Sequence, residues 1–396
     1  MAIFAARTGG VFRVTKREFG RIFASWYYLI LLVVLPIASF AILWTIFGDG
    51  VPRDLPLAVV DQDHSALSRQ LTRMVDATPS LSVAVQVPDL EAARSLILRN
   101  KVYGFIVIPS DMERDVRRGE APAVVAYYNA QLLLPASLIR RDLRMAVGTL
   151  SAVAELKVRE AHGEPPRAAM AHLEPIRLDY HTLFNPQLSY LYYLVAALLP
   201  TMLQIFVTVG TVHALGVELK EGTAGAWMEA AGGSAWRAVV GKLLPYTAHF
   251  SVLSLFMLVV LFRYMGVPMR GSMQVIVAGT LLFVLAYQAV ALLVVAWIAN
   301  LRFATSVAAF YCTPAFAFVG ITFPTMAMPV LGRVWGAVLP LTHYLKILVD
   351  QAMRGTAPAN SMASLGALLV FVCVAPLISV WRMGEVARDP RHWGRL

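Results

Sequence analysis

Charged side chains are scarce in this chain. Asp, Glu, Lys and Arg make up only 15% of its 396 residues, whereas 58% of the residues are hydrophobic. Soluble domains carry about 25% charged residues, so the composition excludes a wholly soluble protein. The charges are also unevenly placed, because 33 of the 58 lie between positions 49 and 179. The composition therefore predicts a membrane domain and one water-soluble domain.

Cysteine is nearly missing and a nucleotide-binding loop is absent. Cys312 and Cys373 both lie in apolar runs, which excludes a disulfide framework in the charged segment. No P-loop occurs, because Gly241-Lys242 is followed by Leu243 and not by Ser or Thr. We therefore expect no cofactor and no metal on this chain, and any ATP would bind to a separate subunit.

Long apolar runs are what the chain has instead. The basic N-terminal segment leads into a run too long for a cleavable signal peptide. A helix that crosses a bilayer needs about 20 residues. Six stretches free of Asp, Glu, Lys and Arg are long enough: Ile22–Gly48, Tyr180–Val217, Leu243–Phe262, Gly271–Leu301, Phe303–Gly332 and Gly355–Trp381.

The Lys and Arg residues predict the orientation. With the N-terminus placed inside, the inner segments hold 13 Lys or Arg residues and the short outer loops hold five. Both termini are then cytoplasmic, and the large insert is extracytoplasmic. The net charge of +10 comes from residues that flank apolar runs, so we expect no nucleic-acid partner. The predicted domains are 1–25 (amphipathic cytoplasmic helix), 26–48 (first span), 49–187 (periplasmic), 188–382 (remaining spans) and 383–396 (cytoplasmic tail).

The insert alternates between strand and helix periodicity. Such alternation predicts an α/β sheet with helix-covered faces. The predicted strands are Leu57–Val60, Leu81–Val87, Tyr103–Ile108 and Val124–Tyr128, and the predicted helices are Ser65–Asp76, Leu90–Lys101, Asp111–Arg118 and Leu132–Ala161. The Pro-rich stretch His162–Pro186 is typical of a linker.

Asp61, Asp63 and His64 follow the first predicted strand, where ligand sites of α/β domains often lie. A metal or acid–base site is one interpretation. The simpler interpretation is that Asp63 or Ser65 caps the helix that follows. Two Asp and one His without partners elsewhere favour capping.

The segment after the second span differs from a plain solvated loop. Residues 218–242 contain Glu218, Glu221 and Gly222-Thr223, then a short helical piece with Trp227 that we expect to be exposed. Apolar side chains exposed on a cytoplasmic loop usually find a partner surface. This segment is therefore predicted to dock a soluble partner.

Proline interrupts the fifth predicted span and the region after it. Broken helices at membrane depth are tolerated only against protein or a water-filled cavity. We interpret residues 323–345 as outer, partly re-entrant half-helices that could close a pathway; a kinked span with a surface loop is the alternative. The candidate gate residues are Phe323, Pro324, Met328, Pro329, Pro340, Thr342, His343 and Tyr344.

Ionisable groups are almost absent from the predicted spans. Carriers driven by protons or ions usually place such groups at depth, so a self-powered transporter is disfavoured. A lone His in a span is more often an interhelical hydrogen-bond partner than a proton relay. The polar exceptions are Gln204, Thr208, His213, His249 and Gln288.

Together these features resemble the permease subunits of bacterial ABC type-2 exporters, in particular the drug- or lipid-export group with a large periplasmic domain. The resemblance covers the whole chain and rests on the basic segment Arg13–Arg21, the start of the insert (Leu57–Leu71), Glu218–Thr223, Val239–Tyr246, Phe323–Pro329 and Pro340–Leu345. It implies an α-helical integral membrane protein with six transmembrane helices and an α/β extracytoplasmic domain inserted between helices 1 and 2.

The resemblance also implies partners and roles. The partners are ABC ATPase subunits that bind ATP and Mg, a second permease subunit, a periplasmic adaptor and an outer-membrane channel, with the lipid bilayer of the bacterial inner membrane around the chain. The implied ATPase-coupling residues are Arg17, Glu18, Phe19, Glu218, Glu221, Gly222 and Thr223. A non-enzymatic exporter subunit for amphipathic compounds is the expected function. The alternatives are a membrane-anchored sensor or scaffold and, less favoured, a membrane enzyme.

Overall fold

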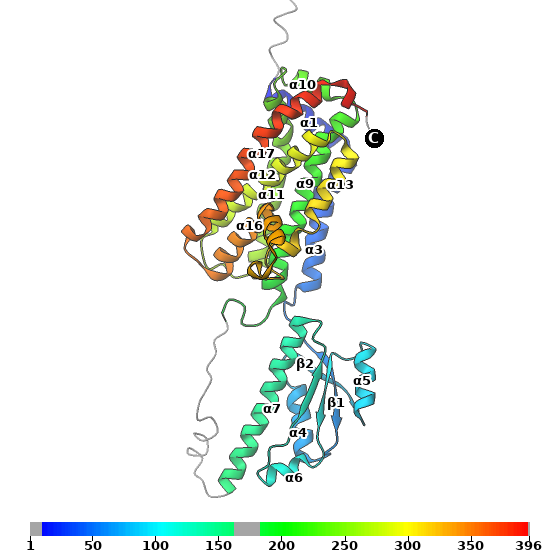
Figure 1. Ribbon diagram of the computed structural model, residues 1–396, viewed down its shortest axis with the longest axis vertical. Helices are drawn as coiled ribbons and strands as arrows, with labels where there is room; N and C mark the ends of the chain where they lie inside the picture. The colour runs from blue at the N-terminus through cyan, green and yellow to red at the C-terminus, as the bar shows by residue number, and fades with distance from the viewer. Residues whose placement is uncertain (1–9, 162–182, 395–396) are drawn as a thin grey trace, which may run out of the picture. The chain divides into compact units, whose positions relative to one another are not determined.

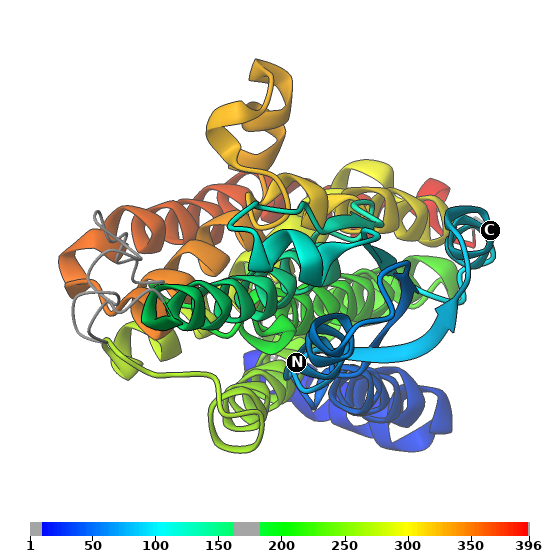
Figure 2. The ribbon, with the colours of Figure 1, turned by 90° about the horizontal axis from the view of Figure 1, so that it is seen from below.

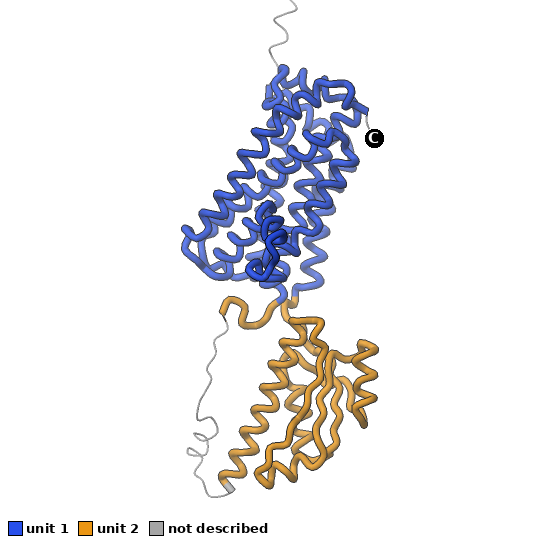
Figure 3. The backbone as a smooth tube through the Cα atoms, viewed as in Figure 1, with its two compact units in different colours: residues 1–48, 190–396 blue, residues 49–189 orange. Residues whose placement is uncertain are grey.

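The computed structural model describes residues 10–161 and 183–394 (Figure 1). The chain divides into two compact units (Figure 3). We call residues 1–48 and 190–396 the helical unit and residues 49–189 the α/β unit. The predicted domain at 49–187 has nearly the same limits as the α/β unit. Residues 162–182 of the predicted linker His162–Pro186 lie outside the described residues. Positions 1–9, 395 and 396 also lie outside them.

The α/β unit is built on a four-stranded sheet with the order β2-β1-β3-β4. The two central strands and β2 run parallel, and β4 pairs with β3 in the antiparallel direction. All four strands lie where the sequence predicts them: β1 (Leu55–Asp61), β2 (Leu81–Val87), β3 (Gly104–Ile108) and β4 (Val125–Tyr128). Runs of β-branched residues explain the two buried central strands.

Helices cover both faces of this sheet. One face packs Leu57, Val59 and Ile106 against α4 and α7, and the other packs Ala58 and Val60 against α5. Alternate residues of one strand point to opposite faces, so β1 contributes to two cores. The helices are α4 (Ala66–Asp76), α5 (Leu90–Leu98), α6 (Met112–Arg117) and α7 (Leu133–Ala161), close to the predicted ranges.

In the described part of the helical unit, five helical runs are long and apolar enough to cross a membrane: Trp26–Phe47, Leu191–Lys220, Ala235–Tyr264, Met273–Ile298 and Pro358–Arg388. They contain α2 (Trp26–Leu29), α3 (Leu35–Phe47), α9 (Ala196–Lys220), α11 (Ala235–Val259), α12 (Met273–Ile298) and α17 (Met362–Arg388). At the centre, α12 packs against α9, α11 and α17. The buried rings of Phe283 and Tyr287 lie on this helix.

The second helical run begins near Leu191, shortly after position 188, where the remaining spans were predicted to start. Residues 180–182 of the charge-free stretch Tyr180–Val217 lie outside the described residues. The side chain of Asn185 accepts a hydrogen bond from the backbone N–H of Ser189 at 2.9 Å and donates one to the Ser189 carbonyl at 3.1 Å. This local turn, which follows from the tendency of Asn to bond nearby backbone groups, directly precedes the helical run.

The predicted crossing at Phe303–Gly332 is not one continuous helix. It begins as α13 (Leu301–Cys312), breaks at Thr313-Pro314 and resumes as the short α14 (Ala315–Phe318). Proline lacks a backbone N–H and clashes with the preceding turn. Two further short helices follow, α15 (Val330–Ala337) and α16 (Pro340–Leu348). In Figure 2 the gold segment between α13 and α16 stands out from the helical unit.

Candidate functional site

One end of the helical unit is closed by the N-terminal helix α1 (Val11–Ala24), which packs along α11. The Thr15 hydroxyl donates to the Gly241 carbonyl at 2.8 Å. A Cβ atom at position 241 would lie 2.7 Å from the Val11 carbonyl oxygen and 2.8 Å from the Val14 Cβ. Glycine at this position therefore lets the two helices approach closely. Ser25 then adopts an extended conformation and separates α1 from the first span.

A buried carboxylate lies beneath α1. Glu218, at the end of α9, is fully buried and accepts two hydrogen bonds from the guanidinium of Arg17, at 2.8 and 2.9 Å. It also accepts from Arg21 at 2.7 Å and from the Lys242 ammonium at 2.8 Å. Paired charge-assisted contacts of this kind are stronger than neutral hydrogen bonds. One carboxylate thus joins α1, α9 and α11.

The second carboxylate of the junction is Glu18. It accepts a hydrogen bond from Lys242, whose side chain is fully buried, and another from the Tyr246 hydroxyl at 2.8 Å. Burial opposes the charge of Arg21, but Glu218, Glu18 and Glu221 together raise its pKa above the ordinary value. We call Arg17, Glu18, Arg21, Glu218, Lys242 and Tyr246 the charged junction.

A turn beside the charged junction reaches solvent. Glu218 to Thr223 ends α9 in a Schellman motif, in which the Thr223 N–H donates to the Glu218 carbonyl and the Gly222 N–H donates to the Leu219 carbonyl. Gly222 has φ of +69°, a conformation that favours glycine. Glu221 is 51% exposed by its side chain and pairs with Arg21 at 2.9 Å. Of the predicted coupling residues, Glu221, Gly222 and Phe19 are exposed, whereas Glu18 and Glu218 are buried.

The expectation that Trp227 is exposed was wrong. Trp227 lies in α10 (Ala224–Ala230) and is fully buried. Its Nε1–H donates to the Ala238 carbonyl at 3.0 Å, and the Lys242 ammonium lies 5.7 Å from the ring centroid. The ring fills the space between α10 and α11 and contributes a cation–π contact. Trp227 therefore stabilises the turn from within.

The C-terminal segment packs against the same turn. A Cβ atom at Gly225 would lie 2.9 Å from the ring of Trp393, and the Gly394 N–H donates to the Leu219 carbonyl at 2.9 Å. The sequence predicted only a cytoplasmic tail here. The sequence analysis did not include four residues of this region among the site residues: Lys242, Arg21, Tyr246 and Trp393. For Lys242, its position directly before an apolar run could have indicated a charge at the end of a membrane helix.

The polar residues of the predicted spans contact neighbouring helices. Gln204 donates to the Cys312 carbonyl at 3.1 Å and accepts from the Tyr287 hydroxyl. His249 bonds the Leu32 carbonyl at 2.8 Å. The remaining contacts are those of Thr208 with Cys312 and the Gln204 carbonyl, of His213 with the rings of Tyr27 and Tyr28, and of Gln288 with Thr247.

The candidate gate residues separate into two groups. On α16, Pro340 and Tyr344 are buried, and the Tyr344 hydroxyl accepts from Thr280 of α12 at 3.1 Å. His343 bonds the Ala337 carbonyl at 2.9 Å, and the Thr342 hydroxyl is buried without a partner among the described residues. In the segment before α16, Phe323, Pro324 and Pro329 are exposed and Met328 is buried.

The polar cluster after β1 shapes the backbone around it. Ser65 caps α4, accepting from the Ser68 N–H at 3.0 Å, as one of the two capping alternatives predicted. Asp61 accepts from the N–H groups of Asp63 and His64, and Asp63 accepts from the N–H of Glu113. These carboxylates thus cap turns and the start of α6.

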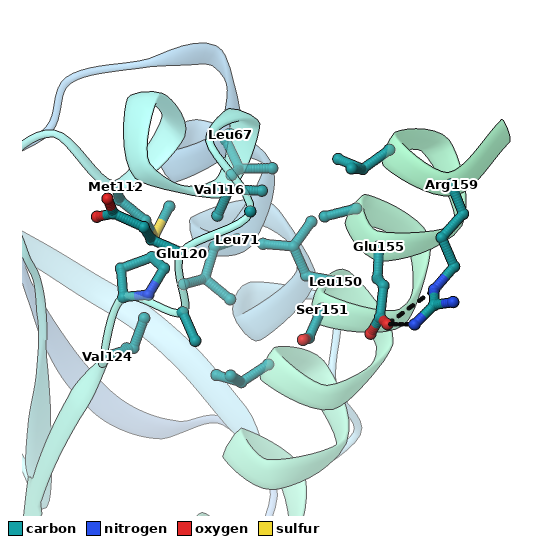
Figure 4. Close-up of a pocket in the computed structure, with 16 residues that line it drawn as sticks. Leu67, Leu71, Met112, Val116, Glu120, Val124, Leu150, Ser151, Glu155 and Arg159 are labelled. Atoms are coloured by element: carbon teal, nitrogen blue, oxygen red, sulfur yellow. Dashed lines mark hydrogen bonds and ion pairs between the residues drawn. The ribbon is translucent and has the colours of Figure 1, made fainter. Parts of the chain in front are cut away.

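The α/β unit contains a cavity of about 470 Å³ (Figure 4). Its walls are largely apolar and come from α4, α6, the segment after α6 and α7. Polar groups lie on both sides, with Glu120 on the segment after α6, and with Ser151 and the 2.8 Å ion pair of Glu155 and Arg159 on α7. Ligand cavities in proteins typically measure about 300–1,000 Å³ and combine apolar walls with few polar groups. The lining residues labelled in Figure 4 include Leu67, Leu71, Met112, Val116, Val124, Leu150 and Ser151.

The family was tested by comparison with known proteins. A sequence profile of the ABC-2 family transporter proteins matches residues 26–381. No curated protein sequence matches the chain. The matched range includes all five apolar helical runs almost completely, together with the α/β unit. The chain therefore belongs to the ABC-2 family of transporters, as a membrane subunit that pairs with a separate ABC ATPase subunit.

Proposed function

We propose that this chain is the permease subunit of an exporter that moves amphipathic, drug-like or lipid-like compounds outward across a bacterial inner membrane. ATP and Mg would bind to the partner ATPase. Two permease subunits, identical or homologous, would form the pathway. In this proposal the α/β unit is periplasmic, both termini are cytoplasmic, and an adaptor and an outer-membrane channel continue the route.

The charged junction is the observation that carries the coupling role. Its ion pairs join α1 to the ends of two apolar helices, α9 and α11, directly beside the exposed turn at Glu221 and Gly222. Buried and multiply paired charges hold one geometry because any displacement leaves a charge uncompensated. A force that the ATPase applies at this turn would therefore reach both helices together.

The coupling role predicts a selective effect of Glu221→Ala. We expect the variant to copurify less ATPase and to lose most of the ATPase stimulation that transported compounds produce, while it unfolds at nearly the wild-type temperature. Glu229→Ala is the matched control, because Glu229 is also exposed on the neighbouring α10. Both activities should be measured in lipid nanodiscs. Full stimulation in Glu221→Ala would refute this role.

We propose that the outer gate is made of the segment from Phe323 to Leu345. Tyr344 is anchored to α12 through Thr280, whereas the preceding α15 exposes Val330, Leu331 and Val334. An anchored half-helix beside a weakly packed one is an arrangement that can open without disturbing the central helices. The exposed apolar residues of α15 also offer a contact surface to a second subunit.

The cavity of the α/β unit favours a second candidate function, in which this unit senses a ligand. The probe for this function is palmitate that carries a diazirine, crosslinked to the full chain in nanodiscs and mapped by mass spectrometry. Ala154 lines the cavity, whereas the exposed Ala152 does not. If the probe binds in the cavity, Ala154→Trp should abolish the labelling of α7 and Ala152→Trp should preserve it. That result, together with the absence of a copurifying ATPase, would favour the sensor over the exporter.

A further inference from the structure

A groove on the helical unit has no assigned role. It has a volume of about 250 Å³ and lies between α11, α12 and α17. Its walls are almost entirely apolar and its lining includes no Asp, Glu, Lys, Arg or His. This volume is below the usual range for whole drug-sized ligands. The groove therefore suits one apolar part of a molecule, such as a pair of rings.

An unmatched polar group lies in this groove. Gln288 lines it and is only 3% exposed. The amide oxygen of Gln288 accepts from the Thr247 hydroxyl at 2.7 Å, but its nitrogen Nε2 has no hydrogen-bond partner among the described residues. A buried donor without an acceptor is destabilising, because it has lost its hydrogen bonds to water. An occupant with an acceptor at this point would remove that penalty.

The surroundings limit the occupant to a neutral molecule. Thr247 follows Lys242 by five residues, about 8 Å along the helix and away from the charged junction. At this depth a charged ligand would face apolar walls without a counter-ion, which is strongly unfavourable. A plain hydrocarbon chain would fill the groove but would leave Nε2 unsatisfied. A neutral apolar compound with one acceptor, such as a ketone or an ester, satisfies both conditions.

We propose that the groove between α11, α12 and α17 binds neutral, largely apolar compounds whose hydrogen-bond acceptor meets the amide nitrogen of Gln288. Binding at this site needs no ATPase and no transport. Its failure would therefore leave the exporter proposal standing, and failure of the exporter proposal would leave this site standing.

Benzophenone is a suitable probe, because it joins two apolar rings to one ketone acceptor and crosslinks to nearby C–H bonds on irradiation. Deuterated benzophenone is added to the full chain in nanodiscs, and mass spectrometry locates the adducts. We expect adducts on peptides of α11, α12 and α17 around the groove. Unlabelled benzophenone should compete about fivefold better than diphenylmethane at equal concentration in the bilayer, the ratio expected for one hydrogen bond.

Two pairs of variants complete the test. Val372 lines the groove and Val374 of the same helix is exposed outside it, so Val372→Trp should abolish the groove adducts and Val374→Trp should retain them. Gln288→Leu removes the amide at similar volume and should make the two competitors equal. The proposal would be overturned if Val372→Trp were labelled as strongly as the wild type, or if the two competitors were equally effective in the wild type. It would also be overturned if the wild-type groove gave no adducts because a second copy of the chain covers it.

Discussion

At the scale of single residues, Glu218 is the most connected charge in the described chain. It is fully buried and bonds two arginines, one lysine and the Thr223 hydroxyl. Removal of one partner from a buried ion network leaves an uncompensated charge and costs about 3–5 kcal/mol. We expect Glu218→Gln to lower the free energy of unfolding by this amount, measured by denaturation in detergent with tryptophan emission as the signal.

The matched control is Glu221→Gln, three residues further along. Its carboxylate is half exposed and has one arginine partner, so the expected change is within about 0.5 kcal/mol. Equal destabilisation by the two substitutions would show that the buried network does not hold the junction.

The sequence could not have identified this network in full. Glu218 and Thr223 were predicted as site residues because the resemblance to ABC type-2 permeases implies a coupling role for the segment that contains them. Their main partners, Arg17 and Lys242, are 201 and 24 residues away from Glu218. No local pattern shows which distant cation lies next to a given carboxylate. The same limit explains Trp227, whose burial depends on α11 and not on its own neighbours in sequence.

At the scale of elements, α1 depends on one small residue of another helix. Gly241→Ala would place a methyl group 2.7 Å from the Val11 carbonyl oxygen, inside contact distance. We expect α1 to move away and its amide hydrogens, in residues 11–24, to exchange with solvent at least tenfold faster. Hydrogen exchange with mass spectrometry measures this directly.

Gly20→Ala in α1 itself is the control for that experiment. A Cβ atom at position 20 meets nothing within 4 Å, and alanine favours the helix over glycine by roughly 1 kcal/mol. Exchange in α1 should therefore stay the same or slow down. The role of close approach at Gly241 would be contradicted if α1 exchanged faster in Gly20→Ala, or if its exchange in Gly241→Ala were no faster than in the wild type.

Element boundaries were predicted best where the chain signals them locally. The strands of the α/β unit follow from alternation and β-branched residues, and the break at Thr313-Pro314 follows from proline chemistry. The second helical run starts near Leu191, close to the predicted position 188, and the turn that the Asn185 side chain forms before it was not predicted. The packing of Trp393 on α10 was also missed, since a tail of mixed composition carries no periodic signal.

At the scale of the whole molecule, the proposed orientation gives a simple labelling test. Ala152 on α7 and Glu229 on α10 are both exposed. With the α/β unit outside, a cysteine at 152 should react with a membrane-impermeant maleimide in intact bacterial spheroplasts. A cysteine at 229 should react only after the membrane is permeabilised. The reverse pattern would show that the predicted orientation is inverted.

The division into two units has a spectroscopic consequence. All eight tryptophans lie in the helical unit, at positions 26, 44, 227, 236, 297, 335, 381 and 393, and residues 49–189 contain none. Tryptophan emission during heating therefore reports on the helical unit alone, whereas far-ultraviolet circular dichroism reports on both units. If the two units melt independently, the two signals will give different midpoints for the same sample.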